Sequence, residues 1–147
     1  MQYSILITGC SSGIGLEAAK MLQERDFLVV ASCRQQEDVE ALKAQGIKHV
    51  VCLDLADSAS ISRGLEETLT ITNGQLFALF NNGAYGQPGA VEDLPVDALR
   101  AQFECNFFGT HELTTKVLKI MLAQGFGRIV NNSSVLGLVA APFRGAY

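Results

Sequence analysis

The sequence predicts an α/β fold in which a mostly parallel sheet is covered by helices on both faces. Two observations support this prediction. First, short apolar segments alternate along the whole chain with longer segments that carry apolar residues at helical spacing. Second, glycines gather directly after several of the short segments, where ligand-binding loops begin in sheets of this kind.

Five short segments are predicted to be strands. They are mostly apolar and show little alternation with polar residues, as expected of strands that are buried on both faces. The predicted strands are residues 4–8, 27–32, 49–53, 76–81 and 128–132.

Four longer segments are predicted to be helices, and they are residues 13–25, 37–45, 58–72 and 96–124. Either Asp57 or Ser58 could cap the third helix, because a short side-chain oxygen can accept hydrogen bonds from the unpaired amides of the first turn. The fourth helix is long for a globular protein. We expect it to bend at residues 106–109 and to end at Gly125 in a left-handed cap.

Strands that alternate with helices are joined by right-handed crossovers, so the expected sheet is parallel and doubly wound. This is a Rossmann-type architecture, and residues 1–147 form one such domain. Because ligands in open α/β sheets bind at the carboxyl ends of the strands, we expect the functional residues in the loops that follow the strands.

The composition indicates a folded protein, because 48% of the residues are apolar and only 18% are charged. The net charge of -4 argues against a nucleic-acid partner, since phosphate binding requires a concentrated basic face. The N-terminal apolar segment has no basic region before it and is too short for a signal peptide or a membrane span. A cytoplasmic protein without a membrane span is therefore expected.

The cysteines and histidines do not form a recognisable site. The four cysteines lie far apart and include no C-x-x-C pair, so we expect free thiols in a reducing compartment. His49 and His111 stand alone and are interpreted as structural residues. No metal site is predicted.

The segment Thr8-Gly9-Cys10-Ser11-Ser12-Gly13-Ile14-Gly15 connects the first predicted strand to the first predicted helix. Glycine allows a sharp turn and lets a diphosphate approach the backbone without a Cβ in the way. The helix behind the loop offers unpaired amides and the positive end of its dipole. The Gly-x3-Gly-x-Gly spacing differs from the common G-x-G-x-x-G fingerprint, and a merely tight turn is the alternative for this motif alone.

This loop resembles the Thr-Gly-x3-Gly-x-Gly loop of the short-chain dehydrogenase/reductase family, and later motifs follow in that family's order. Asp54 ends the third predicted strand, where such proteins hold the adenine ring. Asn81-Asn82-Gly83-Ala84 is similar to the family's Asn-Asn-Ala-Gly with the last two residues exchanged, and both are small enough to keep the turn. The resemblance implies these cofactor-binding residues: Thr8, Gly9, Ser11, Ser12, Gly13, Ile14, Gly15, Arg34, Asp54, Leu55, Asn81, Asn82 and Gly83.

The end of the second predicted strand indicates which dinucleotide is bound. An acidic side chain there would bind the ribose 2′-hydroxyl of NAD and repel the 2′-phosphate of NADP. The strand instead ends in Ser32-Cys33-Arg34, and Arg34 can make charge-assisted hydrogen bonds to a phosphate. We expect NADP(H) to be preferred over NAD(H), with a solvated surface arginine as the alternative interpretation of Arg34.

Three residues match the family's catalytic positions. Ser134 follows the fifth predicted strand, and Tyr147 stands thirteen residues after it. This interval is similar to that in the family, where the serine and the tyrosine reach the same carbonyl oxygen. Asn106 falls at the family's helix asparagine. The family's fourth member, a lysine one helical turn after the tyrosine, would lie beyond Tyr147, the last residue.

The resemblance implies a role for each of the three. Hydride passes between C4 of the nicotinamide and the substrate carbon, and the tyrosine gives or removes the proton. A free phenol is a poor base near neutrality, so the family's lysine favours the phenolate. The serine polarises the substrate oxygen, and the asparagine helps hold a water and the lysine in a proton relay. Taken singly, Ser134 could be a turn residue, Asn106 a helix-bend residue and Tyr147 a packing residue.

The function implied by the resemblance is an NADP(H)-dependent oxidoreductase that interconverts an alcohol and an aldehyde or ketone. The chain is especially similar to the branch that handles retinoids, steroids and other apolar carbonyls, so a small apolar substrate is expected. Leu136, Leu138, Val139 and Phe143 could line an apolar substrate wall or could belong to the core. The alternative function is a non-catalytic dinucleotide-binding or redox-sensing module, or an inactive fragment of the enzyme.

Members of the family run to roughly 250 residues, so the resemblance implies that the domain at 1–147 is incomplete at its C-terminus. A product of 147 residues would leave a sheet edge unpaired and an apolar face uncovered, and we expect it to self-associate. The intact protein is expected to form a dimer or a tetramer.

Overall fold

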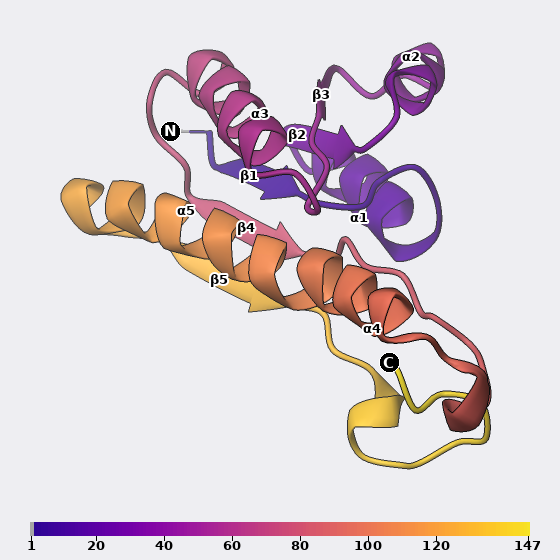
Figure 1. Cartoon of the computed structure of the whole chain (residues 1–147). Helices are drawn as coiled ribbons and strands as arrows, with labels where there is room; N and C mark the ends of the chain where they lie inside the picture. Colours follow the sequence, from indigo (N-terminus) through magenta and orange to yellow (C-terminus); the bar gives the residue numbers. More distant parts are fainter. Residues whose placement is uncertain (1) are drawn as a thin grey trace.

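The computed structural model describes residues 2–147 and contains one parallel sheet of five strands (Figure 1). The strand order is β3-β2-β1-β4-β5, which confirms the doubly wound Rossmann-type prediction. The order reverses between β1 and β4, so the loops after these two strands flank the place where open α/β sheets bind ligands. The strands are β1 (Ser4–Ile7), β2 (Leu28–Cys33), β3 (His49–Cys52), β4 (Ala78–Asn81) and β5 (Arg128–Asn131).

Helices cover both faces of the sheet and create two separate cores (Figure 1). Because side chains alternate along a strand, Ile5 and Ile7 point to one face and Leu6 to the other. The face of Ile5 packs against α1 (Gly13–Glu24) and α2 (Gln36–Ala44). The face of Leu6 packs against α3 (Ser58–Ile71) and α5 (Thr110–Gln124).

The start of α3 distinguishes between the two cap candidates. The Asp57 carboxylate accepts a hydrogen bond from the Ala59 amide at 2.9 Å, so Asp57 is the N-cap. The Ser58 hydroxyl instead donates to the Glu112 carboxylate at 2.6 Å and links α3 to α5. The cap is therefore Asp57 alone.

The long predicted helix is divided where a bend was expected. It consists of α4 (Val96–Phe103), a π-helical segment η2 (Glu104–Gly109) and α5. A Cβ at Gly109 would overlap the Leu55 carbonyl oxygen, so the glycine lets the helix approach the loop after β3. Gly125 ends α5 with a φ of 80°, the predicted left-handed cap.

The C-terminal segment leaves the sheet and packs beside the loop that precedes α4 (Figure 1). This region contains two short 3-10 turns, η1 (Val91–Asp93) and η3 (Val135–Gly137). A parallel β-bridge joins Gly89 to Arg144, and the Gly89 amide donates to the Phe143 carbonyl at 3.0 Å. Two segments far apart in the sequence are thereby held together at the carboxyl end of the sheet.

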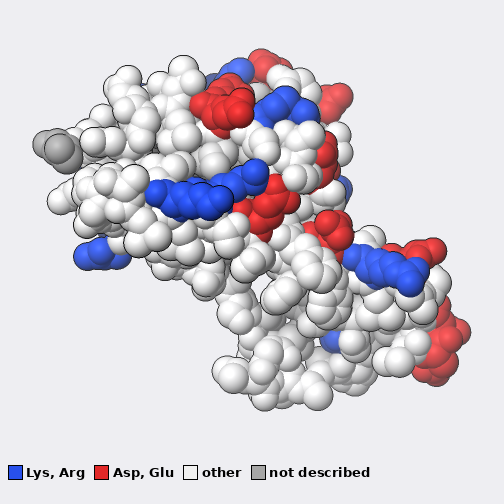
Figure 2. Space-filling view, turned by 60° about the vertical axis from the view of Figure 1, so that its left-hand side comes forward, with Lys and Arg blue, Asp and Glu red and all other residues white. Residues whose placement is uncertain are grey.

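Charged side chains on the face drawn in Figure 2 form several groups of mixed sign, and the lobe at the bottom of the view is almost free of charge. Residues 132–143, which contribute to that end of the molecule, contain no charged residue. Among residues 2–147, no helix combines the length and the apolar character that a membrane crossing requires.

Candidate functional site

Thr8 joins the loop after β1 to the loop after β4. Its buried hydroxyl oxygen accepts hydrogen bonds from the amides of Asn82 at 3.0 Å and Gly83 at 2.7 Å. The Asn82 side-chain amide donates in return to the carbonyls of Thr8 at 3.1 Å and Gly9 at 3.2 Å. These four hydrogen bonds fix the two loops against each other at the point where the strand order reverses.

The glycines of the first loop are required by close packing and by backbone conformation. A Cβ at Gly9 would lie 2.7 Å from the Gly83 Cα, and a Cβ at Gly15 would overlap the Gly9 carbonyl oxygen. Gly13 has a φ of +60°, which L side chains rarely adopt, and apart from its chain neighbours and its own helix backbone no atom lies within 4 Å of where its Cβ would be. The loop is therefore compact on its inner side and open in front of Gly13.

The N-terminus of α1 is prepared to receive an anion. Ser12 is the N-cap residue, but its side chain makes no capping hydrogen bond, and no acidic residue occupies the first turn. The first amides of the helix thus keep their hydrogen-bonding capacity and the positive end of the dipole is not neutralised. Ser11, Ser12 and Ile14 are exposed around this helix end.

A cleft of about 480 Å³ begins at this loop and runs past the ends of β2 and β3. It brings together seven of the predicted cofactor residues, namely Thr8, Gly9, Ser11, Arg34, Asp54, Leu55 and Gly83. The other six do not line it: Ser12, Gly13, Ile14 and Gly15 shape the loop and the helix start, while Asn81 and Asn82 hold neighbouring strands and loops.

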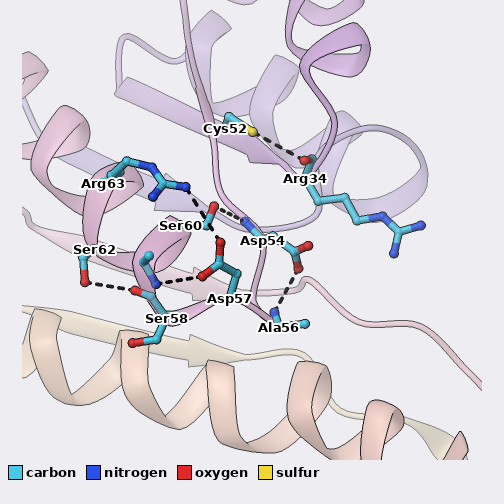
Figure 3. A network of polar contacts seen from close by, with 10 residues as sticks. Arg34, Cys52, Asp54, Ala56, Asp57, Ser58, Ser60, Ser62 and Arg63 are labelled. Atoms are coloured by element: carbon cyan, nitrogen blue, oxygen red, sulfur yellow. Dashed lines mark hydrogen bonds and ion pairs between the residues drawn. The ribbon is translucent and has the colours of Figure 1, made fainter.

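Arg34 and Asp54 occupy the same end of this cleft but do not pair with each other (Figure 3). The Asp54 carboxylate accepts from the Ala56 amide at 2.9 Å, and the Asp54 amide donates to the Ser60 hydroxyl at 3.0 Å. Within residues 2–147, the exposed Arg34 guanidinium has no hydrogen bond or ion pair to a side chain or carbonyl. Arg34 is therefore available to a bound anion.

The sequence interpretation missed several residues that line this first cleft, and they are Cys33, Gln35, Asp38, Leu53, Ala84, Tyr85 and Cys105. Ala84 and Tyr85 directly follow the Asn-Asn-Gly motif, so their position after a strand could have indicated them. Cys105 gave no such signal, because it reaches the cleft only through the packing of η2 against the loop after β3.

Asparagines bridge β4 and β5 at their carboxyl ends. The buried Asn81 side-chain amide donates to the Thr114 hydroxyl at 2.9 Å and to the side-chain oxygen Oδ1 of Asn131 at 2.8 Å. One residue further, Asn132 donates to the Asn82 side-chain oxygen at 2.9 Å. The exchanged Gly83 is closely surrounded, since a Cβ there would lie 3.0 Å from Leu55 Cδ1.

A second cleft of about 290 Å³ adjoins the first and contains Asn106, Ser134 and Tyr147. The fold thus brings together the three predicted catalytic residues, which come from η2, from the end of β5 and from the C-terminal segment. Ala84 lines both clefts. The other residues around the second cleft are Gln102, Phe103, Phe107, Asn132, Ser133, Gly137 and Ala146.

The polar side chains of the second cleft differ in their hydrogen bonds and in their exposure. Asn106 is bound to the Tyr85 backbone at both ends of its amide, accepting from the N–H at 3.1 Å and donating to the carbonyl at 2.7 Å. The Ser134 hydroxyl oxygen accepts from the Leu136 amide at 3.1 Å. Tyr147 is 43% exposed, and its side chain lies beside the backbone of Gly86.

The apolar residues that follow Ser134 in the sequence do not line the second cleft. Leu138, Val139 and Phe143 are strongly exposed, and neither they nor Leu136 lines the second cleft. They do not belong to the buried core either, so the interpretation as core residues was wrong, while a role in a substrate wall stays a prediction. The apolar lining comes instead from Phe103 and Phe107, whose ring centroids lie 6.4 Å apart.

The four cysteines are free thiols. Burial raises the pKa of Cys10 and of Cys33 to about 12, and it also raises the pKa of Cys105. Residues 2–147 hold no group of three or more His, Cys, Asp or Glu side chains that could bind a metal ion.

The profile of the short chain dehydrogenase family matches residues 3–147. The chain is 45% identical to the uncharacterized oxidoreductase YbbO of Escherichia coli, over all of this chain and 54% of the relative. It is 34% identical to human retinol dehydrogenase 8, over 98% of this chain and 48% of the relative. The chain therefore spans about half the length of these curated relatives.

Solved structures agree with this assignment. A short-chain dehydrogenase from Streptomyces avermitilis superposes with a TM-score of 0.90 at 30% identity, over 100% of this chain and 55% of that protein. An NAD⁺-bound xylitol dehydrogenase superposes with a TM-score of 0.88 at 26% identity, over 99% of this chain and 58% of that protein. Together with the loop after β1 and the two adjoining clefts, these matches establish that the chain belongs to the short-chain dehydrogenase family.

Proposed function

We propose that the protein containing this chain is an NADP(H)-dependent oxidoreductase that interconverts an alcohol and an aldehyde or ketone. One observation carries the proposal: two adjoining clefts share the wall residue Ala84. One cleft has an anion-binding loop and an unpaired arginine, and the other holds a serine and a tyrosine. A dinucleotide in the first cleft would present its reactive end to the second.

The residues of the first cleft fit such a dinucleotide. The open space in front of Gly13 and the uncapped start of α1 suit a diphosphate, which the first amides of the helix would bind. Asp54 and Leu55 would hold the adenine end, and Gly83 would let the nicotinamide half pass close to the backbone. The absence of a Cβ at Gly9 and Gly15 lets the loops after β1 and β4 pack closely enough to form this cradle.

Arg34 supports a preference for NADP(H). Its guanidinium is exposed at the rim of the cleft, and no side chain of residues 2–147 neutralises it. A 2′-phosphate is a better partner for this group than a 2′-hydroxyl, because the hydrogen bonds would be charge-assisted.

The second cleft would supply the proton chemistry. When bound, the nicotinamide supplies or accepts a hydride. Tyr147 would give a proton to the carbonyl oxygen during reduction or remove it from the alcohol during oxidation. The Ser134 hydroxyl would orient the same oxygen, and it has a proton to donate because it accepts from Leu136. Asn106 would keep the loop after β4 in position, and a free lone pair on its oxygen could bind water.

The proposal also covers the class of substrate, the cellular compartment and the oligomeric state. Phe103 and Phe107 at the second cleft favour a small apolar substrate. The four free thiols agree with a reducing compartment, and we propose the cytoplasm. Assembly into a dimer or tetramer, with residues 1–147 as part of one larger domain, completes the proposal.

The test is NADPH oxidation in the presence of apolar aldehydes such as octanal and benzaldehyde, with Tyr147→Phe as the variant. We expect loss of the phenol to lower kcat by about a hundredfold or more, since positioned proton transfer contributes that much, with NADPH affinity retained. Tyr3→Phe is the matched control, because Tyr3 packs against Phe77 with ring centroids 4.2 Å apart and lines neither cleft. NADPH binding without turnover of any alcohol or aldehyde would instead favour a dinucleotide-binding module.

A further inference from the structure

The loop after β4 forms the wall between the two clefts. Gly83, Ala84 and Tyr85 line the first cleft, and Ala84 also lines the second. At Gly86, a Cβ would lie 3.7 Å from the ring of Tyr147. A shift of this loop would therefore change the shape of both clefts at once.

This loop has little structure of its own. Residues 82–88 belong to no helix or strand, and none of residues 84–88 makes a hydrogen bond from backbone to backbone with any described residue. Unpaired backbone groups that become partly buried need partners, so something else must hold the loop. The partners are side-chain amides.

Gln102 supplies two of these contacts from the last turn of α4. Its oxygen accepts from the Gln87 amide at 2.7 Å, and its nitrogen donates to the Tyr85 carbonyl at 2.7 Å. Gln102 is 2% exposed and its loop partners are half-buried, so both hydrogen bonds are partly shielded from water. Asn106, one helical turn later, contacts Tyr85 from the same side.

We propose that Gln102 is a positioning residue that holds Tyr85 and Gln87 so that the shared wall fits both the dinucleotide and the substrate. The inference rests on the proposed function, because it assigns the two clefts to these two ligands. Gln102 was not among the catalytic residues predicted from the sequence. Gln102 also lines the second cleft, but both ends of its amide are bound to the backbone of Tyr85 and Gln87, so its effect on the ligands passes through this loop.

The first test replaces the amide by an apolar group in the full-length protein. In Gln102→Leu, hydrogen exchange at the Gln87 amide should accelerate, whereas the Tyr85 amide should stay protected because it donates to Asn106. The dissociation constant for NADPH and the KM for benzaldehyde should each rise by about tenfold, as expected from the loss of buried hydrogen bonds.

Gln124→Leu is the matched control. Gln124 also binds backbone at both ends of its amide, through Leu76 and Phe126, but it lies at the far end of α5. If Gln102 matters only for overall stability, both variants should lose the same cofactor affinity in proportion to their stability. We expect only the Gln102 variant to lose it.

A second variant keeps the shape of the Gln102 side chain but replaces its amide by a carboxyl group, which can lose a proton. In Gln102→Glu, the protonated acid can still donate to the Tyr85 carbonyl, but the ionised form would face that oxygen with a negative charge. Burial favours the neutral form, so NADPH affinity should recover as the pH falls toward 6 and decline as it rises. A variant that only perturbed packing would show the wild-type pH profile.

Unchanged Gln87 exchange and unchanged NADPH and benzaldehyde constants in both Gln102 variants would overturn the inference. The proposed function would still stand in that case, because wild-type NADPH binding and turnover are measured in the same experiment. If the wild-type protein bound no dinucleotide, the proposed function itself would fail, and the inference with it.

Discussion

At the scale of single residues, the cofactor preference depends on Arg34, which stands directly after the last residue of β2. We expect Arg34→Asp to weaken NADPH binding by roughly 10- to 100-fold, since it removes charge-assisted hydrogen bonds and adds repulsion. NADH binding should improve, because a carboxylate can accept hydrogen bonds from the ribose hydroxyl. Dissociation constants for the two cofactors measure both effects.

The control for this prediction is Arg25→Asp, which makes the same charge change at an exposed position after α1. Arg25 does not line the cleft, so both cofactors should keep their affinities. Equal dissociation constants for NADH and NADPH in the wild-type protein would contradict the preference.

The thiol of Cys10 should make the folding stability of the protein depend on pH in the alkaline range. Burial raises its pKa from 9.0 to about 12 in the folded state, so the folded protein binds a proton that the unfolded chain releases above pH 9. The contribution of this thiol to the free energy of unfolding is fully present below pH 9 and is lost as the pH rises from 9 to 12. The expected slope is up to about 1.4 kcal/mol per pH unit.

Urea unfolding at pH 8 to 10.5 measures this effect. Cys10→Ala should be less stable at pH 8 because a buried side chain is lost, but its stability should fall less steeply above pH 9. Cys52→Ala, at a less buried thiol, is the control. Parallel curves for wild type and Cys10→Ala would show that this thiol does not contribute.

At the scale of elements, the π-helical segment η2 positions the site. Gly109 lies against the Leu55 carbonyl, and the same segment carries Cys105 to the first cleft and Asn106 to the second. We expect Gly109→Ala to destabilise the protein by about 2 kcal/mol or more, because the added methyl group has no room. The free energy of unfolding in urea measures this cost.

Gly137→Ala is the matched glycine control for that measurement. A Cβ there would lie 3.9 Å from the Ser133 hydroxyl oxygen, an ordinary distance. Its free energy of unfolding should change by less than about 0.5 kcal/mol. A Gly109→Ala protein as stable as this control would mean that α5 can move away from Leu55 without cost.

At the scale of the whole molecule, the outer side of α5 and β5 is apolar and exposed. Leu122 is 77% exposed and Val130 is 52% exposed, and a cavity of about 500 Å³ lies at this end, next to Leu122 and Phe126. We expect residues 1–147, produced as such, to self-associate through this surface. Leu122→Lys should shift the sedimentation profile toward the 15.8 kDa monomer.

The control adds the same charge elsewhere. Gln45→Lys lies at the end of α2, away from the apolar surface, and should leave the degree of association unchanged. Wild-type residues 1–147 that sediment as a clean monomer would contradict the prediction.

The sequence by itself determined the order and type of the elements and the family. Apolar residues recur with different spacing in buried β-branched strands and in amphipathic helices. The spacing of the glycines in the loop from Thr8 to Gly15 follows from the close contacts that the structure shows at Gly9 and Gly15. These signals are local, so they can be seen without coordinates. The same holds for the αL conformation of Gly125.

Only the tertiary structure decided which side chains meet. Cys105 and Phe107 reach the clefts because η2 packs against the loop after β3, and Gln102 reaches the second cleft from α4. No local pattern marks these three residues. The same reason explains why the core interpretation of two later residues was wrong: Leu138 and Phe143 look like core residues in sequence, but the C-terminal segment carries them outward. Contacts between distant segments depend on how elements pack, and the period of a single segment contains no information about its partners.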